Sequence, residues 1–427
     1  MTDRPNVVVV ITHDTGQQVA PYVDGVATPH LGRLAAQGVV FDHAFSSAPQ
    51  CSPSRASILT GLAPHAHGLI GLTHRGFRLD PAAYRRTLPA LLARAGYSTH
   101  LFGFQHESPD PHALGYEHVA QDPNGRQSAL SVGPRAASFL RARPSEPFFM
   151  MVGFSETHRP FASTNTSLEG IQVPAFLPDN PIVRRDVADL NGEVQKVDWA
   201  IGEILGALDA SGLAENTVLI YTTDHGIAFP GAKATLFDPG ISISLIARGL
   251  GGSGSGKRIN GLVSNVDTYA TILDVCGIAP PAVTHGVSVL PLVRGEAEAV
   301  REHVFAENTY QNAYDPMRAI RTAHYKYIRS FAERPIALPT HVDSSPTKDY
   351  FRDQGYFTRP RPPELLFDLA QDPLERQNLA EDPAYRQIRD DLRRRVEQRM
   401  EETDDPLRLG DIPAPVGARL TPVEAYR

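Results

Sequence analysis

The chain has 427 residues, of which 41% are hydrophobic and 21% are charged, an ordinary globular composition and a length suited to two or three domains. Its formal net charge of −7 argues against a nucleic-acid-binding protein, which normally presents a basic face. That overall charge does not exclude an anionic substrate, because a few cations in a pocket can override it locally.

The beginning of the chain predicts neither a membrane span nor a secretion signal. The apolar run at residues 6–11 is far too short to cross a membrane, and no signal-peptide pattern accompanies it. We therefore expect a cytoplasmic protein with no membrane partner. The two cysteines, Cys51 and Cys276, provide no disulfide framework, and the apolar neighbours of Cys276 are typical of a buried structural thiol.

Strands and helices alternate through the first 250 residues. In chain order, the pattern predicts a strand at 7–11, helices at 29–37 and 88–95, strands at 98–103 and 147–154, a helix at 194–208, and strands at 217–222 and 241–246. This alternation predicts an α/β fold with a large, mostly parallel sheet sandwiched between helices. In such a sheet the functional site forms at the carboxyl ends of the strands.

The pattern changes after a Gly-Glu-Ala-Glu-Ala stretch at residues 295–299. Short strands are predicted at 303–307, 317–321, 326–329 and 365–369, followed by a long charged helix at 384–402. We therefore expect residues 1–298 to form a catalytic α/β domain and residues 299–427 to form a smaller C-terminal α+β subdomain with an antiparallel sheet.

The segment Cys51-Ser52-Pro53-Ser54-Arg55 lies where a helix is expected to begin. The first turn of a helix presents unpaired N–H groups and the positive end of the helix dipole, both of which favour an anion. Arg55 adds a fixed cation, so Cys51 is a candidate nucleophile in an anion-binding nest. The motif alone is equally compatible with an ordinary helix start.

Two pairs of potential metal ligands follow predicted strands. His13 and Asp14 come after the strand at 7–11, and Asp224 and His225 come after the strand at 217–222. Neighbouring parallel strands would bring both pairs to one rim of the sheet, together with Cys51. Carboxylates and imidazoles placed in this way suit one divalent cation. Each pair alone is also compatible with a turn or a helix cap.

Taken together, these motifs resemble the type I sulfatases of the alkaline phosphatase superfamily, whose signature is Cys-x-Pro-Ser-Arg followed by a helix rich in small residues and by Thr-Gly. The similarity extends nearly from end to end and includes residues 27–31, 103–106, 157–159, 224–226, Lys233 and 366–380. Within this family the chain is most similar to the sulfamidases (heparan N-sulfatases), through residues 51–57, 316–321 and 401–406.

The resemblance implies an alkaline phosphatase-like fold and a modified nucleophile. Cys51 would be oxidised by a formylglycine-generating enzyme to 3-oxoalanine (formylglycine), whose hydrate attacks sulfur. One divalent metal ion would stabilise the anionic form of that hydrate. The residues that match the metal ligands of the family are Asp14, Asp224 and His225, with His13 as a fourth.

Four further positions match catalytic residues of the family. Arg55 would stabilise the nucleophile, and His106 would support the hydrate. Lys233 and His158 would hold the sulfate oxygens and protonate the leaving atom. Candidate substrate contacts are Glu156, which precedes Thr157-His158, Gln105, and Glu307 at the end of a C-terminal strand.

Two positions depart from the family pattern. The first of two family aspartates is His13 here, which removes one negative charge and shifts the expected metal from calcium towards magnesium, manganese or zinc. The family motif Gly-Lys-x-His is Gly-Phe-Gln-His in this chain, so Phe104 replaces a lysine that bridges nucleophile and sulfate. We expect His106 or Gln105 to fill the vacant volume, with His106 within hydrogen-bond reach of Cys51.

The sequence therefore predicts a hydrolase that cleaves a sulfate ester or sulfamate (N-sulfo group) from a small sulfated molecule or sulfated sugar. An alternative is a phosphonate monoester or phosphodiester hydrolase of the same superfamily. The absence of the family lysine at position 104 keeps this alternative open. A second alternative is a catalytically silent sulfatase-like binding protein. The expected macromolecular partner is the formylglycine-generating enzyme, no nucleic acid is expected, and an oligomer is compatible with the sequence.

Overall fold

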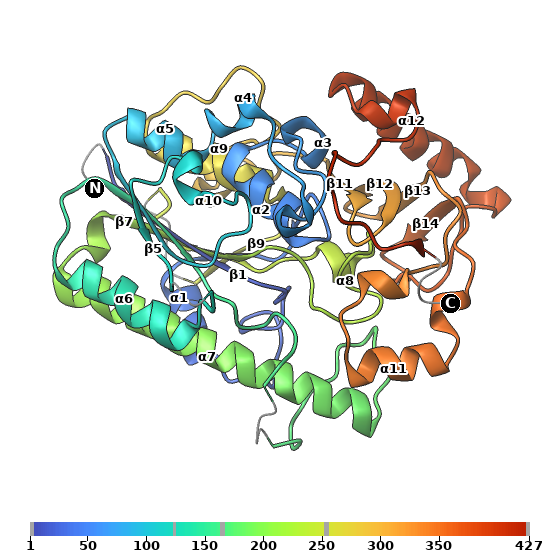
Figure 1. The fold of residues 1–427 in the computed structure, drawn as a ribbon, viewed down its shortest axis with the longest axis horizontal. Coiled ribbons are helices and arrows are strands. Elements are labelled where there is room, and N and C mark those ends of the chain that lie inside the picture. The colour runs from blue at the N-terminus through green and yellow to red at the C-terminus, as the bar shows by residue number, and fades with distance from the viewer. Residues whose placement is uncertain (1–3, 123–124, 163–166, 252–255, 424–427) are drawn as a thin grey trace.

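A computed structural model describes residues 4–122, 125–162, 167–251 and 256–423, and a large sheet runs through its centre (Figure 1). The strand order is β5-β4-β6-β1-β7-β8-β2-β9. In that order the strands are His118–Ala120, Ser98–Gly103, Phe148–Gly153, Asn6–Thr12, Thr217–Thr223, Leu245–Arg248, Val39–Phe41 and Lys257–Ile259. Every pairing is parallel except those of β8 with β7 and β2, so the predicted mostly parallel sheet is confirmed.

Helices cover both faces of this sheet, because each central strand is apolar on both sides. In β1, Val7, Val9 and Ile11 belong to one core cluster, whereas Val8 and Val10 belong to the other. The first face is covered by α2 (Cys51–Thr60), α5 (Leu88–Arg94), α9 (Val266–Val275) and α10 (Leu290–Arg294). The second face is covered by α1 (Pro29–Gln37), α6 (Ala129–Arg141) and α7 (Pro181–Ser211), as Figure 1 shows.

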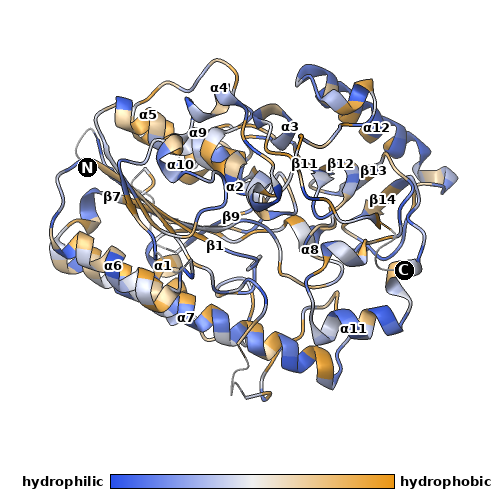
Figure 2. Cartoon of the chain, viewed as in Figure 1, coloured by the Kyte–Doolittle hydropathy of each residue, from blue (hydrophilic) through white to orange (hydrophobic). Residues whose placement is uncertain are grey.

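A second sheet of four antiparallel strands lies beside the first, as predicted for the C-terminal part. Its order is β11 (His303–Tyr310), β12 (Tyr314–Thr322), β13 (Tyr325–Ser330) and β14 (Glu364–Asp368). The helix α12 (Arg386–Glu402) packs on it with Leu392, Val396 and Met400 and is otherwise largely hydrophilic (Figure 2). All four strands follow residue 298, while the domain boundary at that residue stays a prediction.

Smaller elements complete the fold. A two-stranded parallel pair, β3 (Ala44–Phe45) and β10 (Val263–Ser264), joins the region of α2 to α9. The short helices are α3 (Pro64–His67), α4 (Pro81–Tyr84), α8 (Asp238–Ile241) and α11 (Pro346–Asp353). In the part of the chain that the structure describes, no helix is both long and apolar enough to cross a membrane.

Two predicted elements differ from the structure. The strand expected at 241–246 is wrong at its start, because residues 238–241 form α8 and the strand β8 begins only at Leu245. A Pro at the first turn and an acidic residue at the helix start favour that short helix. The helix expected at 194–208 is the second half of α7, which begins at Pro181 after Asn180 caps it through two backbone N–H groups.

Candidate functional site

The ends of β1 and β7 bring the two predicted ligand pairs together. The two strands are parallel neighbours, and Thr12 pairs with Thr223, so the residues that follow them lie side by side. One carboxylate oxygen of Asp224 accepts hydrogen bonds from the backbone N–H of Asp14 and of His225, both at 2.9 Å. This sharing of one acceptor fixes the two strand ends to each other in a fully buried setting.

Cys51 begins α2 and points at this rim. Its Sγ lies 3.3 Å from His225 Nε2 and 3.8 Å from both His13 Nδ1 and Asp14 Oδ1. The residue is 2% exposed, and the Ser54 hydroxyl of the same helix donates to the Asp224 carbonyl. The helix start is thus attached directly to the β7 end, and the positive end of its dipole faces the site.

Two buried cations balance the acidic groups. Arg55 donates from Nε to Asp224 Oδ2 at 3.0 Å and from Nη2 to the Thr12 carbonyl at 3.1 Å. Lys233, which precedes α8, donates to Asp14 Oδ2 at 2.7 Å and to Asp343 Oδ2 at 2.9 Å. Arg55 and Lys233 are 1% and 3% exposed, so each exchanges hydration for these charged partners.

Proton affinities in the cluster are strongly perturbed. Burial acts to raise the pKa of the Cys51 thiol, but the charges of His13 and Lys233 outweigh it and hold that pKa well below its usual value. Burial acts to lower the pKa of His13, yet the surrounding negative charges, first that of Cys51, raise it to about 9. The environment of Cys51 therefore favours an anion at that position.

The donor atoms at this rim fit a single metal ion. Ligand atoms of His13, Asp14, Cys51 and Asp224 all lie within 4.8 Å of one another, and Asp14 Oδ1 is 3.0 Å from His13 Nδ1 and 3.1 Å from His225 Nε2. Metal–ligand bonds of about 2.0–2.2 Å place adjacent ligand atoms about 3.0–3.5 Å apart, so this spacing matches a coordination shell. Two carboxylates and two imidazoles are ligands that suit a divalent cation.

Phe104, which replaces the lysine of the family motif to which this segment was matched, lies beside the cluster. Its ring lies 4.8 Å from the ring of His13 and 5.0 Å from the Arg55 guanidinium carbon, as in a cation–π contact. The carboxamide of Gln105 is used within its own loop, donating to the Ser108 carbonyl and accepting from the backbone N–H groups of Glu107 and Ser108. Gln105 therefore does not fill the place of the lysine, contrary to one of the two expectations.

His106 lies near the nucleophile. One of its ring nitrogens is within 4.8 Å of Cys51 Sγ and of a His13 nitrogen. Its Nε2 pairs with His74 Nδ1 at 2.8 Å, and its Nδ1 is buried without a hydrogen-bond partner among the described residues. The expected hydrogen bond to the Cys51 side chain is not made, although His106 is close to it.

A pocket of about 380 Å³ adjoins the cluster. His158 forms part of its wall, with its ring 4.6 Å from that of His13 and its Nδ1 donating to the Arg159 carbonyl at 2.6 Å. That bond leaves Nε2 available to a ligand. Burial and the charge of Lys233 lower the pKa of His158. The remaining lining residues are His74, Phe104, His106, Arg126, Ser155 and Pro160.

Two predicted substrate contacts are engaged elsewhere. The Glu156 carboxylate accepts from the Ser128 hydroxyl and the Ala129 N–H, both at 2.7 Å, at the start of α6. The Glu307 carboxylate accepts from the backbone N–H of His65 at 2.7 Å and pairs with its Nδ1 at 2.5 Å. Both carboxylates are buried. The structure thus gives each a role in holding the fold, and a direct contact with substrate is not supported.

Sequence reasoning assigned no role in the site to Asp343, His74 or Arg126. Asp343 lies 110 positions from Lys233 in the chain and carries no motif that would have marked it.

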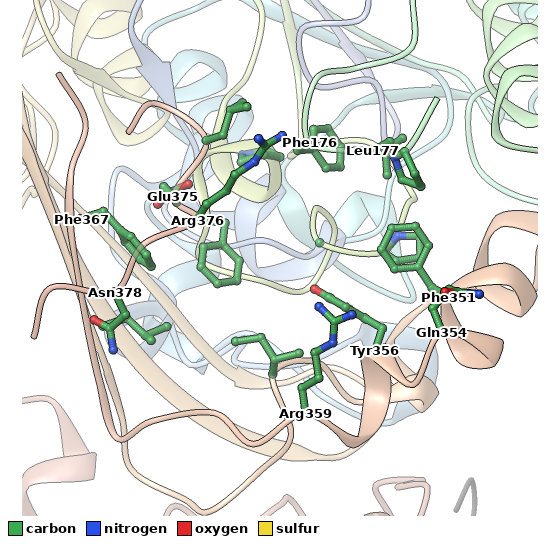
Figure 3. A pocket seen from close by; sticks show the side chains of 18 of the residues that line it. Phe176, Leu177, Phe351, Gln354, Tyr356, Arg359, Phe367, Glu375, Arg376 and Asn378 are labelled. Atoms are coloured by element: carbon green, nitrogen blue, oxygen red, sulfur yellow. The ribbon is translucent and has the colours of Figure 1, made fainter. Parts of the chain in front are cut away.

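A larger pocket, of about 780 Å³, lies between the segment around Leu177, the region of α11 and β14, and contains none of the residues around Cys51. Figure 3 shows its aromatic lining, which includes Phe351 and Tyr356. The candidate catalytic site is therefore identified by its chemistry and not by cavity size.

Comparisons with known proteins agree with this chemistry. The family model described as Sulfatase matches residues 5–278, and the model described as N-sulphoglucosamine sulphohydrolase, C-terminal, matches residues 231–338. The chain is 30% identical to human N-sulphoglucosamine sulphohydrolase over 94% of its own length and 91% of that protein. It is 25% identical to an ulvan-active sulfatase of Formosa agariphila, covering 93% of this chain and 75% of the relative.

Solved structures share the fold. A protein in complex with its substrate D-glucosamine-2-N,6-O-disulfate superimposes with a TM-score of 0.73 at 19% identity, over 94% of this chain and 98% of the other. The phosphonate monoester hydrolase of Agrobacterium radiobacter superimposes with a TM-score of 0.72 at 21% identity, over 94% and 96%. At these identities the likeness concerns the fold alone.

Proposed function

The chain belongs to the sulfatase family and is a sulfuric-ester hydrolase similar to the sulfamidases, and we propose that it removes a sulfamate or sulfate ester group from a small sulfated sugar. The proposed machinery is a formylglycine formed from Cys51 and one divalent metal ion. The observation that carries this proposal is the position of Cys51, which begins α2 within 4 Å of ligand atoms from both strand ends.

The metal ion would be held by Asp14, Asp224 and His225, with His13 as the fourth protein ligand. When bound, it would act as a Lewis acid towards the nucleophile and a sulfate oxygen. The formylglycine hydrate would supply the nucleophilic hydroxyl. Arg55 supports this arrangement because its bond to Asp224 fixes the orientation of one ligand, and its charge compensates the anion that the site favours at position 51.

Lys233 and His158 are the groups that would handle the substrate. Lys233 lies beside Asp14 and projects a buried ammonium into the cluster, where it can pair with a sulfate oxygen. His158 presents its Nε2 in the pocket wall, and the single negative charge of a bound sulfate ester or sulfamate would favour its protonated form. A protonated His158 can then give its proton to the leaving atom.

The alternative substrate class is a phosphonate monoester. Phe104 stands where the family motif named above has a lysine, and it brings no charge to the site. A phosphonate monoester carries one negative charge, as a sulfate ester does, so this position does not favour either substrate by charge. The fold likeness to a phosphonate monoester hydrolase is compatible with this reading, but the sulfamidase relative covers the chain at higher identity.

A substrate panel tests the proposal. Protein co-expressed with a formylglycine-generating enzyme and loaded with metal is assayed on glucosamine N-sulfate, 4-nitrophenyl sulfate and a phenylphosphonate monoester. We expect turnover of the first two, a mass change at residue 51 that marks conversion to the aldehyde, and no turnover by Cys51→Ala. Exclusive hydrolysis of the phosphonate would favour the alternative. Near-wild-type activity of Cys51→Ala would contradict the proposed nucleophile.

A further inference from the structure

Asp343 brings a carboxylate from the C-terminal part of the chain to the catalytic cluster. It lies between residues 339–341 and α11, and its Oδ2 is 2.9 Å from Lys233 Nζ. Carboxylate oxygens of Asp343 and Asp14 and a nitrogen of His158 lie within 4.8 Å of one another. Asp343 is 30% exposed at its side chain, in contrast to the fully buried Asp14, so it lies at the solvent-accessible margin of the cluster.

This carboxylate is unexpected in a site for an anion. Lys233 already has a buried partner in Asp14, at 2.7 Å, and needs only one carboxylate to be neutral. A second negative charge at this margin repels a sulfate group and competes with it for the Lys233 ammonium. Such a placement is favourable when the substrate also brings, or develops, a positive charge at that point.

A sulfamate develops such a charge when it is hydrolysed. In R–NH–SO3⁻ + H2O → R–NH3⁺ + SO4²⁻, the S–N bond breaks, an S–O bond forms, and both water protons end on the nitrogen. The leaving nitrogen changes from neutral to positive, whereas the oxygen leaving from a sulfate ester ends as a neutral alcohol. A carboxylate beside His158, which is placed to deliver a proton, lowers the energy of the amine product and of the transition state leading to it.

We propose that Asp343 is a specificity-determining residue that receives the amine released from a sulfamate and so favours a nitrogen over an oxygen as the leaving atom. The inference rests on the proposed function and adds to it the residue that distinguishes the two leaving atoms. It assigns to one carboxylate the discrimination between two leaving atoms that are otherwise similar in size.

A matched substrate pair tests this assignment. Glucosamine N-sulfate and glucose 2-O-sulfate differ at the leaving atom while sharing the ring and the position of the sulfo group. For Asp343→Asn we expect kcat/KM on the N-sulfate to fall about 10- to 100-fold, less than for a fully buried group because Asp343 is partly exposed. On the O-sulfate we expect a change of less than about three-fold or a gain, since a repulsive charge is removed.

The control variant is Asp349→Asn on α11, a residue of the same segment that is 59% exposed and paired with the exposed Arg352. We expect this variant to leave both rates unchanged. Thermal unfolding is measured alongside, and Asp343→Ser is the second variant if Asp343→Asn folds poorly.

The outcomes separate the inference from the proposed function. Equal losses on both substrates would show that Asp343 acts only by positioning Lys233, and no loss on either would show that it does not meet the leaving group; both overturn the inference. A wild-type enzyme that cleaves only the O-sulfate would also overturn the inference, because no amine is then released for Asp343 to receive. A wild-type enzyme that cleaves neither sugar while hydrolysing phosphonates would contradict the proposed function.

Discussion

Replacing Lys233 by methionine should expose how much of the site's stability depends on one buried ammonium. Lys233 is 3% exposed and pairs with the fully buried Asp14 at 2.7 Å and with Asp343 at 2.9 Å. Methionine keeps most of the volume and removes the charge, so Asp14 keeps a buried carboxylate with one counter-ion fewer. Breaking a buried ion pair in this way costs about 3–5 kcal/mol. Asp343 contributes little to this loss, because it is 30% exposed and can regain hydration.

The assay is urea unfolding of the metal-free and the metal-loaded protein. We expect Lys233→Met to lose about 3–5 kcal/mol without metal and clearly less with metal, because a divalent cation replaces the missing positive charge beside Asp14. Turnover of the metal-loaded protein should fall about 100- to 1,000-fold, since the sulfate loses a charged donor. The control is Lys196→Met, which breaks the Lys196–Glu193 pair at a lysine that is 31% exposed.

A double-mutant cycle gives the decisive comparison. In an Asp14→Asn background no buried carboxylate remains for Lys233 to neutralise, so Lys233→Met should then cost less than about 1 kcal/mol. An equal cost in both backgrounds would refute the reasoning, because it would trace the destabilisation to lost packing of the lysine stem and not to the ion pair.

Four further predictions concern single side chains. Asp14→Ala should lower the bound metal to a small fraction of one equivalent by metal analysis, and wild-type metal content would exclude Asp14 as a ligand. His106→Ala should lower turnover about 100-fold, because a donor close to Cys51 is lost. Phe104→Lys should fold normally and should change the ratio of the rates of sulfate and phosphonate hydrolysis. Burial lowers the pKa of His67 from 6.5 to about 3. Between these two pH values the unfolded chain binds a proton at His67 that the folded chain does not bind. The stability that is present above pH 6.5 is therefore lost as the pH falls towards 3. His67→Gln should therefore make the urea midpoint fall less steeply between pH 6.5 and 4, and an unchanged slope would contradict the assignment.

The fold and the centre of the site could be predicted because their signals are local. The run of β-branched residues in β1 and β7 marks buried strands, and the residues after each strand must lie at its carboxyl end. Cys51 is found in the same way, since Pro53 and the small residues after it mark a helix start. Given a parallel sheet, these local facts are enough to bring His13, Asp14, Asp224 and Cys51 to one rim.

The remaining parts of the site depend on side-chain direction and on distant segments. Glu156 has the residue type and the sequence position of a substrate contact, yet its carboxylate is used by the start of α6, a helix that begins 27 positions earlier at Ala129. Gln105 neighbours His106, a candidate catalytic residue, but its carboxamide turns into its own loop. Asp343 reaches Lys233 only because the second sheet packs beside the first, and no local pattern contains that information.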